Sequence, residues 1–171
     1  PGEFQLAWQA PKFQDFRRAW FLDACNKLKV APILHRKLWE EAYVLKCLEA
    51  TGLLHPGSRG LGFGCGEEPF GSLFADRGVE VVVTDIDPGN QAAAGWVESR
   101  QHASNIETAY RPALVSRAKF DSLVTFEYLD MNRIPMELAG QFDFCWSVCA
   151  LEHLGSIQLG SPFVENSLAV L

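Results

Sequence analysis

Residues 57–87 read GSRGLGFGCGEEPFGSLFADRGVEVVVTDID, and this stretch decides the fold. A glycine-rich turn, Gly62–Gly66, is followed by a helix predicted over about Glu67–Arg77, with apolar residues on one face. A β-branched run, Val79–Thr84, then stops at Asp85. Strand, glycine turn, helix, strand and acid is the order of the nucleotide-binding half of a Rossmann-type βαβ unit.

The spacing of the glycines limits which kind of nucleotide the turn could bind. The dinucleotide fingerprint G-x-G-x-x-G fails, because its third glycine would be Glu67 counted from Gly62, or Cys65 counted from Gly60. A P-loop fails too, because no Lys-Ser or Lys-Thr follows the glycines. The turn reads G-x-G-x-G, and Glu67 and Glu68 after it would repel a pyrophosphate at the helix start. A ligand with a sulfonium, an ammonium and no phosphate would not be repelled.

This stretch resembles motif I of the class I S-adenosylmethionine-dependent methyltransferases. The resemblance implies that the backbone of the turn cradles S-adenosylmethionine and that the acid after the second strand accepts hydrogen bonds from both ribose hydroxyls. The family usually has Asp or Glu two residues before the first glycine, where this chain has Gly60, so the partner of the methionine ammonium is missing or comes from elsewhere. The residues assigned to the cofactor here are Gly62, Phe63, Gly64, Cys65, Gly66, Asp85 and Ile86.

A third strand is predicted over Ser122–Leu129, and Asp130 and Met131 follow it. An acid and an apolar residue at this place resemble the adenine-binding element of the same family. A carboxylate can accept the adenine amino hydrogens, and a methionine offers a polarizable face to the ring. An Asp at a strand end is often only a turn or a helix cap, so this assignment depends on its register with the glycine turn.

A fourth strand is predicted over Gln141–Val148, and the segment Ser147–His153 resembles motif IV of the family. The resemblance assigns Ser147 to the cofactor. Glu152 and His153 are the acid–base candidates of the chain, and the alternative is that they only pack at a helix start or bond to the cofactor.

We expect an α/β fold with a Rossmann-like, mostly parallel sheet of order 3-2-1-4, flanked by helices. Such sheets bind ligands at the carboxyl ends of their strands, so the four loops should meet at one crevice. Two helices, Phe13–Leu28 and about Ile33–Thr51, precede the sheet and would form an N-terminal cap over residues 1–52. The core would then take residues 53–171, with further helices over Gln91–His102 and from Ser161, its N-cap, onward.

The family domain normally continues with three more strands after the last predicted helix. We therefore expect either a truncated domain or a chain whose sheet closes through a second copy, that is, a homo-oligomer. A fourth strand at the edge of the sheet would otherwise be a pairing hazard.

The composition of the chain limits the kinds of binding partner that we expect. The 171 residues carry a net charge of -6, which argues against a nucleic-acid backbone. Five cysteines at irregular spacings, without CxxC, predict reduced thiols rather than disulfides or a metal site. No signal peptide or membrane span is predicted, so we expect a cytoplasmic protein.

The function expected from the resemblance is S-adenosylmethionine-dependent methyl transfer to a small-molecule acceptor. The Asn-Pro-Pro-Tyr type motif of amino-group methyltransferases is absent, since Ser147-Val148-Cys149-Ala150 stands there, and this favours an oxygen of a small molecule, sugar or lipid. Two alternatives stay open: a binding module that keeps the fold without activity, and a dinucleotide-dependent oxidoreductase.

Overall fold

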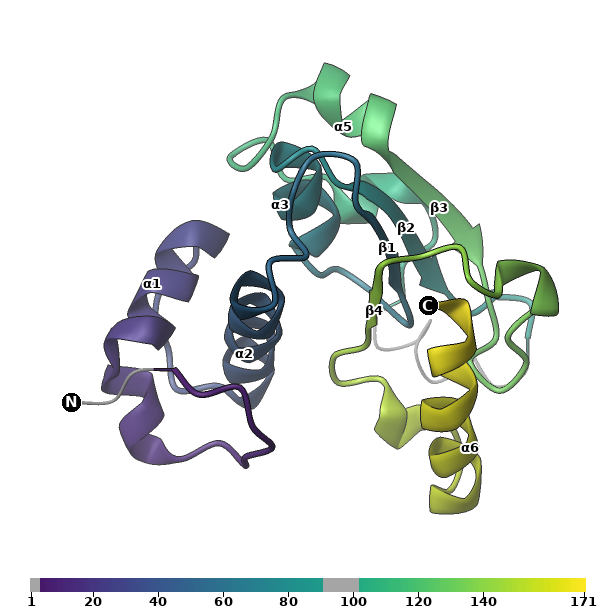
Figure 1. Ribbon diagram of the computed structural model, residues 1–171, viewed down its shortest axis with the longest axis horizontal. Coiled ribbons are helices and arrows are strands. Elements are labelled where there is room, and N and C mark those ends of the chain that lie inside the picture. The colour runs from purple at the N-terminus through teal and green to yellow at the C-terminus, as the bar shows by residue number, and fades with distance from the viewer. Residues whose placement is uncertain (1–3, 91–101) are drawn as a thin grey trace. The chain divides into compact units, whose positions relative to one another are not determined.

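The computed structural model describes residues 4–90 and 102–171. The chain divides into two compact units, Pro1–Leu54 and His55–Leu171, and each is described by itself. The first contains helices and the second a sheet with helices (Figure 1). The division that the sequence suggested, after residue 52, and the role of a cap both stay predictions. No helix in the described part of the chain has the length and apolar character needed to cross a membrane.

The first unit consists of a 3₁₀ helix and two α-helices. The 3₁₀ helix η1 (Phe13–Arg17) leads into α1 (Ala19–Leu28), and α2 spans Arg36–Ala50. The single helix predicted over Phe13–Leu28 is therefore broken at Arg18, whose backbone is extended.

Ion pairs and edge-on ring contacts join α1 to α2. The Nζ atom of Lys27 on α1 lies 2.9 Å from Oε1 of Glu49 on α2. The rings of Trp39 and Tyr43, both on α2, stack with their centroids 4.8 Å apart, and the ring of Trp20 on α1 meets each of them edge-on at 6.2 Å. The buried carboxylate of Asp15 accepts a hydrogen bond from Trp39 Nε1 at 3.2 Å. Trp20, Trp39 and Tyr43 are thus used in packing, whereas Trp8 and Phe13 are exposed.

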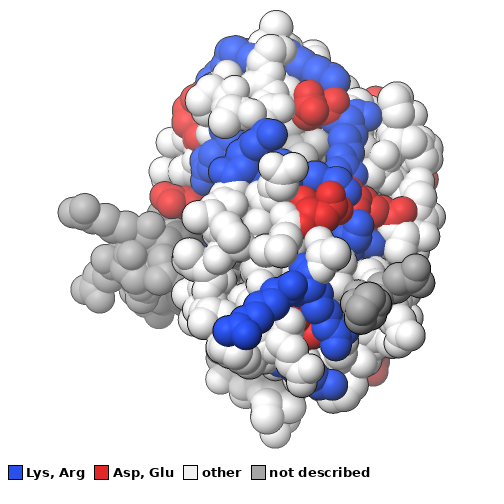
Figure 2. Space-filling view, turned by 90° about the vertical axis from the view of Figure 1, so that its left-hand side faces the viewer, with Lys and Arg blue, Asp and Glu red and all other residues white. Residues whose placement is uncertain are grey.

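Charge is distributed unevenly between the units. Residues 1–54 contain eight Lys and Arg against six Asp and Glu, whereas residues 55–171 contain seven against fifteen. Figure 2 faces the α1 side and shows basic side chains over much of this surface, with fewer acidic ones between them. The acidic balance of the whole chain is therefore a property of the second unit.

The second unit is built on a four-stranded parallel sheet. Its strand order is β3-β2-β1-β4, and every pair of neighbours is parallel. This confirms the α/β fold class and the order 3-2-1-4 expected from the sequence, which is part of the Rossmann order. The strands are β1 (Arg59–Gly62), β2 (Glu80–Asp85), β3 (Val124–Tyr128) and β4 (Phe144–Trp146), and the α-helices are α3 (Phe70–Asp76), α5 (Arg117–Leu123) and α6 (Ile157–Ser167).

Strand β1 has few apolar side chains of its own. The aromatic rings of its neighbour β4 cover it instead. A Cβ on Gly60 would overlap the ring of Phe144, and a Cβ on Gly62 would overlap the indole of Trp146. These two rings cover the glycines on the face where α3 packs, and the ring of Phe74 on α3 meets both of them edge-on. The glycines of β1 are therefore required by packing within the sheet.

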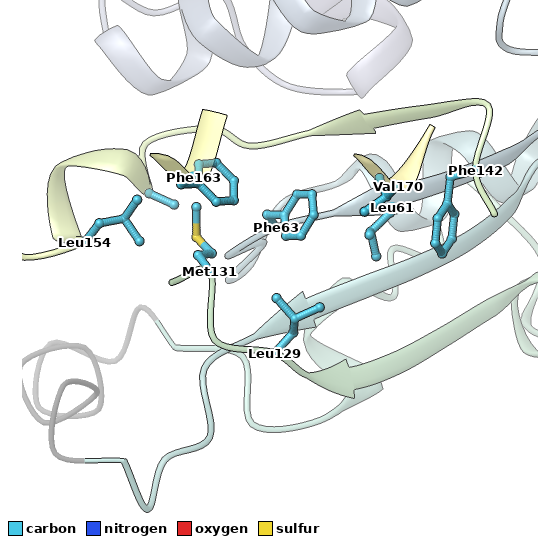
Figure 3. Close-up of a cluster of buried hydrophobic side chains, with 9 residues drawn as sticks. Leu61, Phe63, Leu129, Met131, Phe142, Leu154, Phe163 and Val170 are labelled. Carbon is cyan, nitrogen blue, oxygen red and sulfur yellow. The ribbon is translucent and has the colours of Figure 1, made fainter. Parts of the chain in front are cut away.

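On the opposite face of the sheet, α6 covers a second cluster of buried side chains (Figure 3). The ring of Phe163 on α6 meets the ring of Phe63 at 5.2 Å in a T-shaped contact. Figure 3 shows the cluster extending from Phe142 to Leu154 along the sheet. Its buried members are Leu61, Phe63, Leu129, Met131, Phe142, Ala150, Leu154, Phe163 and Val170.

The segment that precedes β4 is hydrogen-bonded to residues near the end of the described chain. The carbonyl of Ala169 accepts a hydrogen bond from Gly140 N, and the carbonyl of Val170 accepts from Gln141 N and Phe142 N. The fourth strand is therefore less open at its amino end than the sequence suggested.

Helix α6 begins earlier than predicted. Its N-cap is Ser156, whose side chain accepts from Leu159 N, whereas Ser161 and Pro162 lie inside the helix. The prediction of Ser161 as N-cap is therefore wrong, because an equally good cap lies one turn and a half upstream.

Other boundaries differ as well. The strand predicted over Gln141–Val148 has only three residues in β4, and the helix predicted from Glu67 starts at Phe70. The helix predicted over Gln91–His102 falls on residues 91–101, outside the described part of the chain.

Candidate functional site

A cavity of about 120 Å³ lies at the carboxyl ends of the strands, where the topology predicts a ligand site. All four strands contribute to it, through the glycine turn after β1 and the segments after β2, β3 and β4. Its lining residues are Gly64, Asp85, Ile86, Leu129, Asp130, Met131, Asn132, Ala150, His153, Leu154 and Gly155.

The glycine turn is hydrogen-bonded to β4 on one side and to β2 on the other. Phe63 N donates to the Trp146 carbonyl at 2.8 Å, and Cys65 N donates to the Thr84 carbonyl at 2.9 Å. Gly64, between them, has a φ of +61°, in the left-handed region that favours glycine. The turn is thus fixed by its own backbone and presents Gly64 to the cavity.

Gly64 leaves open a space that a side chain would fill. A Cβ at this position would lie 2.8 Å from the Ala150 Cβ and 3.2 Å from the Met131 Sδ. Both neighbours line the cavity. The backbone can therefore come close to a ligand only because residue 64 is glycine.

Asp85 is tied to the protein by both carboxylate oxygens. Oδ1 accepts from Ile86 N and Oδ2 accepts from Ala103 N, each at 2.8 Å, and the residue is 9% exposed. The hydrogen bond from Ala103 N thus holds residue 103 at the end of β2. A carboxylate has about four lone-pair sites, so acceptor capacity toward the cavity remains.

The segment after β3 forms the opposite wall. Oδ1 of Asp130 accepts from Asn132 N at 2.9 Å, which closes a small turn, and the residue is half-buried. Leu129 N donates to the Asp85 carbonyl at 2.8 Å and so continues the pairing of β3 with β2. Met131 is buried beside the cavity. An apolar wall with a carboxylate at its rim suits a flat, polar-edged ring.

The loop after β4 separates the two acid–base candidates. His153 lines the cavity, whereas Glu152 lines a second hollow of about 470 Å³. Both residues are exposed on the 3₁₀ helix η5 (Leu151–His153). His153 is thus the candidate with access to a ligand in the cavity. The remaining residues of the second hollow are Leu151, Gly155, Ser156, Ile157, Gly160, Ser161 and Val164.

The structure brings together only part of the predicted set. Six of the predicted residues line the cavity: Gly64, Asp85, Ile86, Asp130, Met131 and His153. Six others do not line it: Gly62, Phe63, Cys65, Gly66, Ser147 and Glu152. Phe63 and Cys65 have buried side chains, so any contact they make with a ligand would come from their backbone.

Sequence reasoning missed the apolar part of the lining. Leu129, Ala150 and Leu154 are cavity residues that also belong to the buried cluster of Figure 3. In the sequence they read as ordinary core positions, and only the geometry of the strand ends shows their second role. Among residues 4–90 and 102–171, no group of three or more His, Cys, Asp or Glu is placed to hold a metal ion.

Comparison with known proteins adds little to this geometry. No family model and no curated protein matches the chain. Among solved structures, one similar fold is that of a putative sarcosine dimethylglycine methyltransferase from Galdieria sulphuraria, with 20% sequence identity and a TM-score of 0.41. The match covers 64% of this chain and only 36% of that one. So distant a match carries no argument about either the fold or the site, and both rest on the residues described above.

Proposed function

We propose that this chain binds S-adenosylmethionine at the carboxyl ends of its strands and transfers the methyl group to a small-molecule acceptor. The observation that carries the proposal is the cavity in which Gly64, Asp85, Asp130 and Met131 meet from three strand ends. Each of these residues was assigned to the cofactor from the sequence alone.

The residues fit the adenosine part of this cofactor. Residue 64 has no Cβ to fill the space between Ala150 and Met131, so the turn leaves room for a nucleoside. Asp85 would accept from the ribose hydroxyls, and Asp130 from the adenine amino group, with Met131 against the ring. Pockets for whole small molecules start at about 300 Å³, so the cavity of about 120 Å³ matches one ring system of the ligand.

The chemistry asks little of the protein beyond binding. The bound cofactor would supply a methyl group on a sulfonium. The thioether that leaves when the methyl group is transferred is already an activated leaving group. Alignment of the acceptor can then provide most of the rate, and a base is needed only where the acceptor must lose a proton. His153 is the side chain placed to take that proton, at the wall of the cavity.

The acceptor is proposed to be an oxygen of a small molecule, sugar or lipid, and a cytoplasmic location goes with it. Support comes from the Ser147–Ala150 segment, which differs from the amino-group motif, and from the acidic second unit, which disfavours nucleic acid. A fold that binds the cofactor without transfer is the second candidate. It is favoured by the separation of Glu152 from the cavity that His153 lines.

A matched pair of variants tests cofactor binding. Asp130 and Asp87 both close a turn at a strand end, accepting from the backbone N two residues on at 2.9 and 2.8 Å, but only Asp130 lines the cavity. Asp130→Ala should weaken S-adenosylmethionine binding about tenfold or more, since hydrogen bonds to a charged group contribute about 1.5–3 kcal/mol. Asp87→Ala should leave it unchanged.

Calorimetric titration of each variant provides the measurement. Equal affinities for the two variants would remove Asp130 from the site. Binding without transfer of a tritiated methyl group to any lysate component would favour the inactive module.

A further inference from the structure

The second hollow has room for a whole small molecule. Its volume is about 470 Å³, against about 120 Å³ for the cavity at the strand ends. Pockets for small molecules usually measure about 300–1,000 Å³, so the hollow falls within that range. It lies between η5 and the first half of α6, and the binding of the cofactor proposed above makes no use of it.

The hollow and the cavity border the same residue. Gly155 lines both of them, and its φ of +97° lies in the region that favours glycine. Two neighbouring residues of η5 divide between the two spaces, since His153 lines the cavity and Glu152 lines the hollow. A molecule in the hollow would therefore lie beside the space assigned to the cofactor and close to His153.

The lining of the hollow is mostly apolar. The side chains of Leu151, Ile157 and Val164 are 40%, 83% and 50% exposed, so they present apolar surface to the solvent. The hydroxyl of Ser156 is already used as the N-cap of α6. Among the lining residues that the structure describes there is no Lys, Arg or His, and the one charged side chain is the exposed Glu152. Such a surface suits an apolar, uncharged molecule and disfavours an anion, whose charge would lose water without gaining a cation.

The proton that the acceptor must lose narrows its chemistry further. His153 is the side chain placed to take that proton, and Gly155 brings the hollow next to it. A phenol, whose pKa is about 10, gives up its proton to a general base more readily than an alkyl alcohol does. Among neutral oxygen acceptors, a phenol therefore asks least of a single base.

We propose that this hollow is the acceptor site and that it takes a neutral phenol with an apolar body. The inference rests on the proposed function and narrows its acceptor from any small-molecule oxygen to this class. The apolar body would lie against Ile157 and Val164, with the hydroxyl toward Gly155 and His153. On transfer, the phenol oxygen bonds to the methyl carbon, the electron pair of the broken carbon–sulfur bond stays on sulfur, and the hydroxyl proton goes to His153.

Two probes with the same apolar body test the ligand class. At neutral pH 4-butylphenol is uncharged, whereas 4-butylbenzoate carries a carboxylate in place of the hydroxyl. Calorimetric titration of the full chain, saturated with S-adenosylhomocysteine, should show 4-butylphenol bound about tenfold or more tightly than 4-butylbenzoate. Equal affinities, or no binding of the phenol, would overturn the inference. A wild-type chain that does not bind S-adenosylhomocysteine would instead overturn the proposed function.

Gly160→Leu tests the place of binding. A Cβ at Gly160 would meet no atom within 4 Å, so α6 can accept the larger side chain, which would then occupy the hollow that Gly160 lines. Binding of 4-butylphenol should weaken at least about tenfold, with the affinity for S-adenosylhomocysteine unchanged. Asn166→Leu is the matched control, since Asn166 is exposed on the same helix but does not line the hollow, and it should change neither affinity. Phenol binding that Gly160→Leu leaves intact would refute the assignment.

A second pair of variants covers the case in which Gly160→Leu does not fold. Ile157 and Leu168 are 83% and 61% exposed, so replacing either by Gln should leave the fold intact, but only Ile157 lines the hollow. Ile157→Gln should weaken 4-butylphenol binding about fivefold or more, because apolar contact is lost, and Leu168→Gln should not. Equal affinities for the two variants would count against the hollow.

Methyl transfer shows whether the bound phenol is the acceptor. The wild-type chain with S-adenosylmethionine that carries a tritiated methyl group should label 4-butylphenol. Gly160→Leu should reduce this labelling about tenfold or more at saturating cofactor. A phenol that binds in the hollow and stays unlabelled would overturn the role of the hollow as the acceptor site.

Discussion

Replacing Gly64 by Ala should close the cavity while the sheet stays folded. An L-residue in the left-handed conformation, with φ at +61°, costs about 1–2 kcal/mol. The new Cβ would lie 2.8 Å from the Ala150 Cβ and 3.2 Å from the Met131 Sδ, and such overpacking costs about 1–3 kcal/mol. The free energy of unfolding should therefore fall by about 2–5 kcal/mol.

The same methyl group occupies the space that a nucleoside would take. Displacing it on binding would cost at least part of the overpacking energy, and 1.4 kcal/mol is about a tenfold change in affinity. We expect S-adenosylhomocysteine binding to weaken at least about tenfold, measured by calorimetric titration, with urea unfolding measured in parallel.

Gly60→Ala is the control for lost stability. Its Cβ would overlap the Phe144 ring on the neighbouring strand β4, so it should destabilise the fold by about 1–3 kcal/mol. Gly60 does not line the cavity, so the affinity should match that of the wild type. The reasoning is refuted if Gly64→Ala binds as the wild type does, or if Gly60→Ala loses as much affinity.

Three further predictions concern Asp85, Cys25 and His153. Asp85→Asn loses the charge that accepts from Ala103 N and Ile86 N, so urea unfolding should show a loss of about 2 kcal/mol, against little change in the exposed Asp87→Asn. Burial raises the pKa of the Cys25 thiol to about 11, so the unfolded chain releases this proton first as the pH rises. The stabilisation is complete below about pH 9 and is lost up to about pH 11, and the wild type should lose about 3 kcal/mol more than Cys25→Ala over this range. If His153 is the base, His153→Gln should slow methyl transfer about 100-fold at unchanged cofactor affinity, and Glu152→Gln should not, whereas equal rates for both would exclude that role.

The fold could be predicted from the sequence because its signals are local. The apolar run before Asp85, the glycine turn and the alternating strands and helices identify a parallel sheet, and the order 3-2-1-4 follows from the family resemblance. Short elements were harder, since β4 has three residues and its neighbours Gln141 and Phe142 instead donate to the Val170 carbonyl. That contact joins segments far apart in the sequence, and no local sequence pattern predicts it.

The lining of the cavity could be predicted only where a residue follows the end of a strand. Gly64, Asp85, Asp130 and Met131 could be assigned by position, because the carboxyl ends of parallel strands meet. Gly62 could not be distinguished from Gly64, although the first makes room for Trp146 and the second for the cavity. The difference depends on which side chain of a neighbouring strand faces each glycine, and this is known only from the three-dimensional structure.

Titration of the wild-type chain with S-adenosylhomocysteine, and in parallel with NAD, tests the central claim most directly. A glycine turn that presents Gly64 to the cavity, with Asp85 and Asp130 at two strand ends, predicts one molecule of S-adenosylhomocysteine bound per chain and no heat with NAD. Heat with NAD alone, or with neither ligand, would contradict the assignment of this cavity to a phosphate-free nucleoside.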